Sequence, residues 1–164
     1  MKWIISVIAV AALIFFSINW FKPKGIPMPE FAFMNLDSST VNNSKYMPKG
    51  KFNIILAYFS PDCEHCQSET EDWIKNIDLF KSTKTKFYFI TNDPLERLRV
   101  FNSVYKIYQY TNMELGWDYK WEFFKAYKPT GTPYLIVYNK QKELRAVIPG
   151  GAKSDTLISI IKKF

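Results

Sequence analysis

The hydrophobic positions of this chain fall into one long run, several short runs and a few stripes at helical spacing. The long run covers 3–21, which holds no formal charge and only three polar residues. Two of the short runs, 52–59 and 86–91, are almost entirely apolar and rich in aromatic and β-branched side chains, as strands covered on both faces are. Strands are accordingly expected at 31–36, 52–59, 86–91, 134–138 and 144–148, with the last two forming a hairpin.

Apolar residues at spacings of three, four and seven predict helices between the strands. The first helix is expected over about 63–80. The second begins at Asp93 and Pro94, because proline suits the first turn of a helix and aspartate caps it. A third is expected over 117–127, where core packing explains the repeated aromatic residues better than a partner-binding groove does, and a closing helix is expected around 157–161. Strands that alternate with helices predict an α/β domain.

The long apolar run predicts a membrane-spanning helix. Its nineteen residues would extend about 28 Å at 1.5 Å per residue, which matches the hydrocarbon thickness of a bilayer. Trp3 and Trp20 stand at its two ends, where interfacial aromatic residues belong. A cleaved signal peptide is the alternative, but the run is longer than the apolar part of such peptides and ends in bulky residues that suit cleavage poorly. We therefore expect an uncleaved anchor at 1–22, with the N-terminus inside the cell.

Two further parts are expected after the anchor. Residues 23–50 are assigned to a linker and N-terminal extension, in which 23–29 holds three prolines and 38–48 is a polar loop. Residues 51–164 are assigned to the folded domain.

Charge and composition narrow the classes of function. The 164 residues carry a net charge of +7, but the first 24 residues hold three lysines and no acid, and the other charges are scattered along the sequence. The densest basic run, Lys81, Lys84 and Lys86, lies beside a predicted turn. Nucleic-acid binding needs a clustered basic footprint, so a solvated basic face is favoured and no nucleic-acid partner is expected. One histidine and two cysteines exclude intrachain zinc sites that need several of either residue.

The sequence Cys63-Glu64-His65-Cys66 joins the end of the strand 52–59 to a helix. Two intervening residues at a helix start bring both sulfurs within bonding distance. The first sulfur then lies near unpaired backbone N–H groups at the positive end of the helix, which stabilise a thiolate. Because the thiolate is the species that attacks disulfides, Cys63 is the predicted nucleophile and Cys66 the more buried resolving thiol.

The same spacing is compatible with other roles. An inert disulfide or half of a zinc site would also use two cysteines, but the chain holds no second cysteine pair and no second histidine. Covalent haem attachment requires histidine directly after the second cysteine, where Gln67 stands. The alternative function is a copper-binding or metallochaperone module with Cys63 and Cys66 as soft ligands, although copper sites in related folds usually recruit a distant histidine. The redox role needs no metal and no cofactor beyond the Cys63–Cys66 disulfide.

A proline at the start of a later strand adds to this pattern. Thr130-Gly131-Thr132-Pro133 immediately precedes the strand 134–138. Proline is tolerated at a strand start because no ladder N–H is required there. A cis Thr132–Pro133 bond would turn the Thr132 backbone towards a substrate, and an ordinary trans turn is the alternative.

In its order of strand, Cys63-Glu-His-Cys66, helix and Thr132-Pro133 before a strand, the chain resembles the thioredoxin superfamily. More narrowly, it resembles the TlpA/ResA-like membrane-anchored thiol–disulfide oxidoreductases, over about 52–164 and in its N-terminal anchor. The resemblance implies a thioredoxin-like fold: a central mixed sheet flanked by helices, preceded by one transmembrane helix. It also implies that Cys63 attacks, that Cys66 resolves, and that a cis Pro133 faces both cysteines.

Four residues near the cysteines are candidate modulators of the pair. TlpA/ResA-like proteins carry a glutamate three residues after the second cysteine, as Glu69 stands here; it is either a proton relay for that cysteine or an ordinary acid favoured in an early helical turn. Asp62 stands where thioredoxins usually carry tryptophan, and its carboxylate would oppose a thiolate. A protonated His65 would stabilise the thiolate. Glu64, the fourth candidate, lies between the two cysteines. Because these charges act in opposite directions, the redox potential of the Cys63–Cys66 pair does not follow from the sequence.

The expected function is a membrane-anchored thiol–disulfide oxidoreductase that exchanges the Cys63–Cys66 pair with protein substrates outside the cytoplasm, with Thr132 and Pro133 contacting the substrate. The resemblance places the domain on the periplasmic side of a bacterial inner membrane. Its expected partners are protein thiols and disulfides, and a membrane or extracytoplasmic redox protein that recharges the pair. A reductive role, such as keeping apocytochrome c thiols reduced, is implied by the family alone, and oxidative folding fits the spacing equally well.

Overall fold

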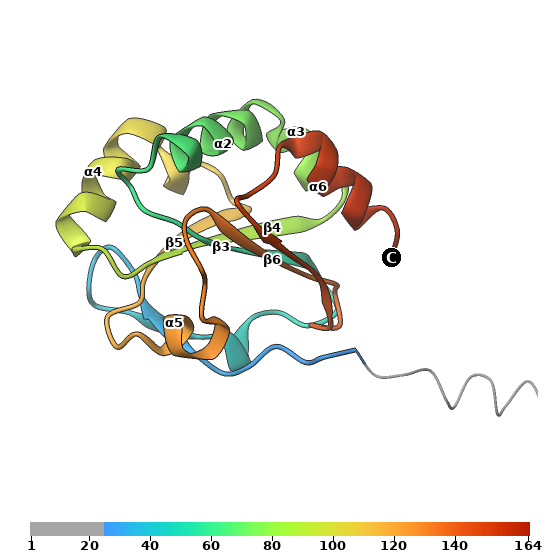
Figure 1. Ribbon diagram of the computed structural model, residues 1–164, viewed down its shortest axis with the longest axis horizontal. Helices are drawn as coiled ribbons and strands as arrows, with labels where there is room; N and C mark the ends of the chain where they lie inside the picture. Colours follow the sequence, from blue (N-terminus) through green and yellow to red (C-terminus); the bar gives the residue numbers. More distant parts are fainter. Residues whose placement is uncertain (1–24) are drawn as a thin grey trace, which may run out of the picture.

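The computed structural model describes residues 25–164, which fold around a seven-stranded sheet (Figure 1). The predicted membrane anchor at 1–22 lies outside the described residues. Within residues 25–164, no helix combines the length and the apolar character needed to cross a membrane.

The sheet is mixed, as expected for the predicted α/β class. Its strands are β1 (Ala32–Met34), β2 (Val41–Asn43), β3 (Asn53–Tyr58), β4 (Thr85–Thr91), β5 (Met113–Trp117), β6 (Tyr134–Tyr138) and β7 (Leu144–Pro149). They are arranged in the order β2-β1-β5-β4-β3-β6-β7. β3, β4 and β5 are parallel, whereas β6 pairs antiparallel with β3, β7 with β6, and β1 with both β5 and β2. The predicted hairpin is formed by β6 and β7.

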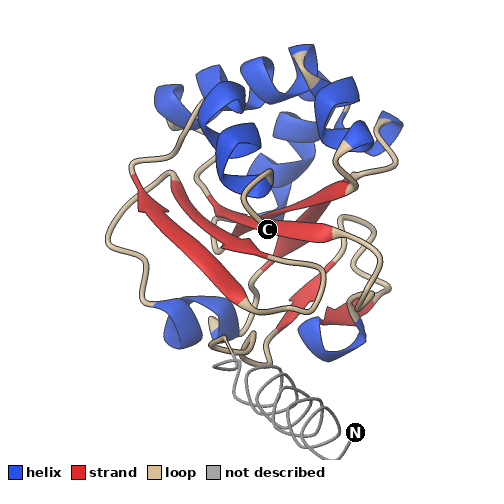
Figure 2. Cartoon of the chain, turned by 90° about the vertical axis from the view of Figure 1, so that its right-hand side faces the viewer, coloured by secondary structure: helices blue, strands red, loops and turns tan. Residues whose placement is uncertain are grey.

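Helices cover both faces of this sheet. They are α2 (Glu64–Lys75), α3 (Ile77–Ser82), α4 (Leu95–Tyr105), α5 (Glu122–Tyr127) and α6 (Ser154–Ile161), with short 3-10 helices η1 (Ser44–Tyr46) and η2 (Ile107–Gln109). α2, α3, α4 and α6 lie on one face, and α5 lies on the other (Figures 1 and 2). The described residues therefore form a thioredoxin-like arrangement of helices around a mixed sheet.

Two hydrophobic cores, one on each face, explain the uninterrupted apolar run of β3. All six of its residues are buried. Ile55 belongs to the core under α2, which contains Trp73, and its neighbour Ile54 belongs to the core under α5, which contains Phe123. Because successive side chains of a strand point to opposite faces, a strand with a core on both sides must be apolar at every position.

The predicted helix over 117–127 is wrong in its first half. Trp117 is the last residue of β5, which pairs with β4 inside the sheet. The helix starts later, where both carboxylate oxygens of the fully buried Asp118 accept backbone N–H groups, from Phe123 at 3.1 Å and from Phe124 at 2.9 Å. The aromatic residues at helical spacing belong to a strand and to the helix that follows it. Their spacing therefore predicted one continuous helix where the structure has two elements.

Two other expectations change in detail. The helix expected over 63–80 is divided into α2 and α3 at Asn76, whose backbone has φ −105° and ψ 20°. The polar loop expected over 38–48 contains β2 and η1. Asn76 donates from its side chain to the Asp72 carbonyl, and β2 pairs with β1, and neither contact is reported by the apolar pattern.

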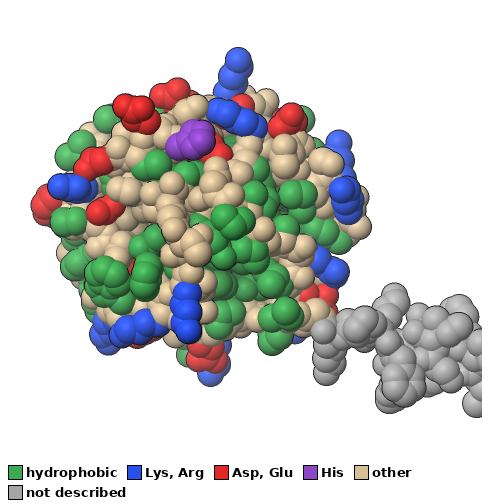
Figure 3. All heavy atoms as spheres, in the orientation of Figure 1, with side chains coloured by type: hydrophobic (Ala, Val, Ile, Leu, Met, Phe, Trp, Pro, Cys, Tyr) green, Lys and Arg blue, Asp and Glu red, His purple; other side chains and the backbone are tan. Residues whose placement is uncertain are grey.

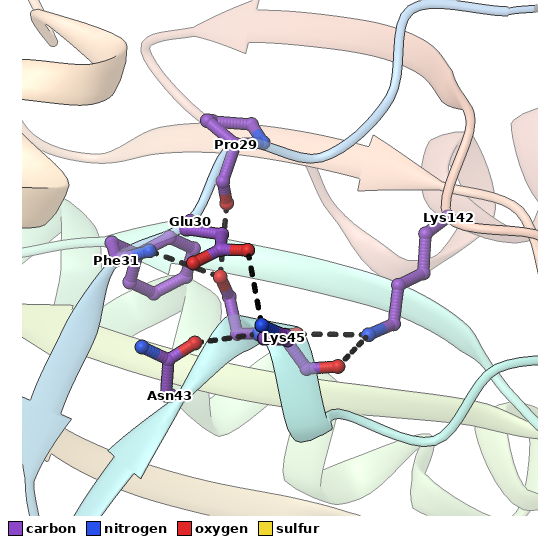
Figure 4. A network of polar contacts seen from close by, with 7 residues as sticks. Pro29, Glu30, Phe31, Asn43, Lys45 and Lys142 are labelled. Atoms are coloured by element: carbon purple, nitrogen blue, oxygen red, sulfur yellow. Dashed lines mark hydrogen bonds and ion pairs between the residues drawn. The ribbon is translucent and has the colours of Figure 1, made fainter.

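The described part of the predicted linker and extension, 25–50, packs against the domain (Figure 4). The Ser44 hydroxyl accepts the backbone N–H of Phe31 at 3.0 Å and donates to the Pro29 carbonyl at 2.9 Å. Lys142, from the turn between β6 and β7, donates from Nζ to the Ser44 carbonyl at 2.8 Å. This segment thereby adds β1 and β2 to the sheet and is fastened to the β6–β7 turn.

Candidate active site

The Cys63 thiol lies at the first turn of α2, directly beyond the end of β3. Cys63 is the N-cap residue of this helix, and its sulfur accepts the backbone N–H of Cys66 at 3.3 Å. The Cys63 carbonyl accepts the N–H of Gln67 at 3.0 Å, which starts the helical hydrogen-bond pattern. A partly exposed sulfur at the positive end of a twelve-residue helix is placed where negative charge is favoured.

The Cys66 thiol is in a different environment. It lies one turn further along α2, and the residue is 2% exposed. Burial, followed by its interaction with Cys63, raises the pKa of the Cys66 thiol to about 12. At neutral pH this thiol is therefore protonated. The structure holds both cysteines as free thiols, one accessible and one buried.

A carbonyl from a distant part of the chain completes the site. The Cys63 thiol donates to the Thr132 carbonyl oxygen at 3.7 Å, across 69 positions of sequence. Thr132 is exposed, Pro133 is buried, and the peptide bond between them is cis. The two segments meet because β3 and β6 are neighbours, with Tyr58 paired to Tyr134. The structure therefore brings the Thr132 carbonyl to the Cys63 sulfur, with the predicted cis bond to Pro133 directly after it.

The charged residues of the motif are exposed at the surface. Asp62 forms an ion pair with Arg97 of α4, with 2.6 Å between Oδ2 and Nη1. His65 and Glu64 are exposed in the first turn of α2, and Figure 3 shows the histidine at the molecular surface. Arg97 thus compensates the carboxylate that precedes Cys63, a contact that no local motif reports.

Glu69 is the one candidate modulator that lies in the interior. The residue is 4% exposed, and its Oε2 atom has no hydrogen-bond partner among the described residues. Burial raises the pKa of the Glu69 carboxyl to about 7; the neighbouring Lys153 opposes this change and Asp72 adds to it. Glu69 lies three positions after Cys66, so both side chains belong to the same face of α2. A buried carboxyl that titrates near neutral pH can exchange protons under physiological conditions.

The space for the Glu69 carboxyl depends on a glycine after β7. A side chain at Gly151 would overlap both carboxylate oxygens, whereas the adjacent Gly150 has open space at the same place. Both glycines have a φ of +81°. Substitution of either glycine would strain a left-handed backbone, but only substitution of Gly151 would also disturb Glu69. No local pattern in the sequence indicates this contact.

We expect Gly151→Ala to destabilise the protein more than Gly150→Ala. Both substitutions place a side chain on a left-handed backbone, which costs about 1–2 kcal/mol. Gly151→Ala must also displace the buried carboxyl, which adds about 1–3 kcal/mol. Thermal unfolding of the full chain in a mild detergent measures the difference, at about pH 5 where Glu69 is neutral. Equal effects of the two substitutions would show that the Glu69 carboxyl moves aside without cost.

A groove extends from the cysteine motif along α4. It has a volume of about 570 Å³, and its wall includes Asp62, Gln67 and Arg97 beside the apolar side chains of Val100 and Val104. Both valines are 63% exposed. Sequence analysis did not single out this groove, because its two walls are brought together only by the packing of α2 against α4.

The alternative metal role requires additional ligands. Among residues 25–164, no three His, Cys, Asp or Glu side chains are grouped as they would be around a metal ion. Cys63 and Cys66 alone would supply two soft sulfur ligands. The observed partners of Cys63 are instead a backbone N–H and a backbone carbonyl.

Comparison with known proteins identifies a family that the sequence matches. The sequence model of the AhpC/TSA family matches residues 25–147. The comparison with curated proteins returns no match.

Solved structures share the whole arrangement. A thiol:disulfide interchange protein of the thioredoxin family from Chlorobium tepidum TLS has a TM-score of 0.70 at 20% identity, covering 87% of this chain and 97% of that one. The thioredoxin domain of a thiol–disulfide oxidoreductase from Bacteroides vulgatus gives 0.68 at 18%, covering 86% and 96%. Peroxidoxin BcpB from Mycobacterium tuberculosis gives 0.71 at 12%, covering 86% and 97%. At these identities the likeness establishes the fold.

Proposed function

The chain belongs to the AhpC/TSA family and is a thioredoxin-fold redox enzyme, and we propose that it exchanges the Cys63–Cys66 pair with disulfides and thiols of protein substrates. We further propose that residues 1–22 anchor it in a bacterial inner membrane, with the domain on the periplasmic side. The observation that carries the proposal is the placement of the Cys63 sulfur between the α2 N-terminus and the Thr132 carbonyl.

The first step is the attack of the Cys63 thiolate on one sulfur of a substrate disulfide. A bond forms between Cys63 Sγ and that sulfur, the substrate S–S bond breaks, and the second substrate sulfur leaves as a thiolate that takes up a proton. The Thr132 carbonyl, 3.7 Å from the Cys63 sulfur, lies where it can accept a backbone N–H of the bound chain. The product of this step is a mixed disulfide.

The second step uses the buried thiol. Cys66 loses its proton and attacks Cys63 Sγ, which releases the reduced substrate and leaves a Cys63–Cys66 disulfide. Because burial raises the pKa of Cys66 to about 12, this thiol needs a proton acceptor. Glu69, on the same face of α2, is the proposed acceptor, since its carboxyl titrates at about 7. The reverse sequence oxidises a substrate dithiol.

The proposal predicts rapid exchange with glutathione and reduction of insulin disulfides by the full chain in detergent. The fraction of oxidised Cys63–Cys66 pair, measured by alkylation and mass spectrometry across glutathione buffers, gives the redox potential. A potential near about −270 mV would make the chain a reductant, and one near about −120 mV an oxidant. Absence of exchange with both substrates would contradict the proposal.

Peroxide reduction is a second candidate, favoured by the match to the AhpC/TSA family. In that reaction the Cys63 thiolate attacks the O–O bond, forms a sulfenic acid and releases water or an alcohol; Cys66 then condenses with the sulfenic acid to a disulfide and releases water. The two candidates differ in their preferred oxidant. Faster oxidation of the reduced chain by hydrogen peroxide than by protein disulfides would favour the peroxidase.

A further inference from the structure

The fold gathers lysines that are scattered in the sequence. Two neighbouring hollows, of about 510 Å³ and 240 Å³, share Lys84 in their walls. No residue in either wall has an acidic side chain. The lysines of the two walls, here called the lysine end, are Lys51, Lys81, Lys84, Lys86, Lys140 and Lys162.

The lysine end lies opposite the cysteines. Lys51 and Lys84 precede β3 and β4, whereas Cys63 follows the other end of β3. Lys140 follows β6, which runs antiparallel to β3 and so ends where β3 begins. The six residues of β3 span about 20 Å. Figure 2 shows the C-terminus near the centre of the view, and the terminal residue, Phe164, belongs to the wall of the smaller hollow.

Most of the positive charge at this end is uncompensated. Lys81 pairs with Asp78 at 3.1 Å, and Lys86 pairs with Glu114 at 2.8 Å. No ion pair within residues 25–164 involves the other four lysines, which are Lys51, Lys84, Lys140 and Lys162. Uncompensated lysines around hollows whose walls hold no acidic side chain form a surface that attracts phosphate groups.

Aromatic side chains accompany these lysines. Lys51 Nζ lies over the Phe52 ring, 5.2 Å from its centroid. Phe52 and Phe164 belong to the walls of the two hollows, and Phe164 is 40% exposed. Exposed phenylalanine side chains beside lysines are a combination that surfaces lying in the membrane–water interface use.

The described chain begins at the same end of the domain. The backbone position of Gly25 lies against the side chain of Glu143 in the β6–β7 turn. Ile26 accepts the N–H of Leu144 through its carbonyl at 2.8 Å, and Met28 donates to the Lys142 carbonyl at 3.1 Å. The apolar stretch 3–21 therefore ends only a few residues before a segment that is fixed at this end of the sheet.

We propose that the lysine end binds a membrane surface through the phosphate groups of anionic lipids. The inference rests on the proposed anchoring by residues 1–22, which would bring a bilayer to this end of the domain. The two hollows would take lipid phosphates, and the aromatic rings would lie at the headgroup level. Cys63 then faces away from the membrane, towards protein substrates in the surrounding solution.

The test uses the full chain with nanodiscs of phosphatidylcholine alone, or of phosphatidylcholine with about a third phosphatidylglycerol. Acylation of each lysine is followed by mass spectrometry. In anionic nanodiscs we expect Lys51, Lys84, Lys140 and Lys162 to be labelled at least about fivefold more slowly than in neutral ones, and high salt should reverse the protection. Lys120, which precedes α5, and Lys125, within α5, should be labelled equally in both. Equal labelling of the lysine end in the two lipids would overturn the inference.

Two triple variants with the same change in charge complete the test. Lys84→Glu with Lys140→Glu and Lys162→Glu should abolish the protection of Lys51. Lys120→Glu with Lys125→Glu and Lys128→Glu, around α5, should retain it. Protection of Lys51 that survives the first triple change would contradict the inference.

Separate measurements distinguish a failure of the lipid-binding inference from a failure of the proposed redox function or of the proposed anchor. Exchange with glutathione, measured on the same samples, reports the proposed redox function and should be unchanged in both triple variants. A full chain that does not co-elute with neutral nanodiscs would overturn the anchor, while its lysines in anionic nanodiscs would still report on the lipid surface. Protection by a DNA oligonucleotide but not by anionic nanodiscs would overturn the inference in favour of nucleic-acid binding.

Discussion

Cys63→Ser is expected to reduce disulfide exchange to the uncatalysed background, whereas Cys66→Ser should stop the reaction at the mixed disulfide. Cys63 carries the accessible sulfur at the start of α2, and a hydroxyl in its place provides no thiolate. Without Cys66 the first attack still takes place, but no buried thiol remains to release the substrate. Non-reducing electrophoresis with insulin or glutathione measures both outcomes.

The assignment of Cys63 as the attacking thiol and Cys66 as the resolving thiol can be checked independently. In the reduced wild-type chain, iodoacetamide at neutral pH should modify Cys63 first, because Cys66 is 2% exposed and its pKa is raised to about 12. Peptide mapping after short exposure identifies the modified residue. Faster modification of Cys66, or mixed disulfides trapped by Cys63→Ser, would reverse the assignment of nucleophile and resolving thiol.

Glu69→Gln is expected to stabilise the protein above neutral pH. The Glu69 pKa of about 7 exceeds the value of 4.5 for an unperturbed glutamate. The carboxyl is neutral in both states below about pH 4.5, so there it has no effect on stability. Between about pH 4.5 and pH 7 the carboxyl ionises in the unfolded chain but stays protonated in the folded one, so the penalty grows over this range. Above about pH 7 the penalty is complete, on the order of 3 kcal/mol. Glutamine keeps the size of the side chain and removes this penalty.

Thermal unfolding at about pH 5 and pH 8 tests the effect of Glu69→Gln. The variant should match the wild type within a few degrees at the lower pH and exceed it by roughly 6–12 °C at the higher one. A second readout separates proton transfer from stability: the variant should accumulate mixed disulfide because Cys66 loses its proton acceptor. Unchanged pH dependence would show that Glu69 is ionised without cost in the folded chain.

The sequence predicted the features whose chemistry is local. The Cys63–Cys66 motif and the Thr132–Pro133 motif can each be recognised from a few adjacent residues. The structure brings the two motifs together. Gly151 and Arg97 were not foreseen, because their importance lies in contacts with Glu69 and Asp62 that only folding creates. Sequence patterns report neighbours along the chain, and packing between elements supplies the rest of the site.

The missed strand and the unforeseen lysine end have the same physical origin. The strand β5 was missed because Trp117 repeats at helical spacing with aromatic residues of the following helix. Its burial beside β4 outweighs that local pattern. The lysines of the lysine end are far apart in the sequence. Lys51, Lys84 and Lys140 come together only because β3 and β4 begin at the end of the sheet where the antiparallel strand β6 finishes.

The strand order has a consequence for how another polypeptide can associate with this enzyme. The outermost strands are β2 and β7. β2 has three residues, two of them asparagine, and β7 carries Arg145 and ends in Pro149. Short, polar or proline-bearing borders are poor templates for adding a further strand. Fibre-like stacking of copies through their sheets is therefore disfavoured, and molecules of this enzyme can be crowded at high density without joining their neighbours edge to edge.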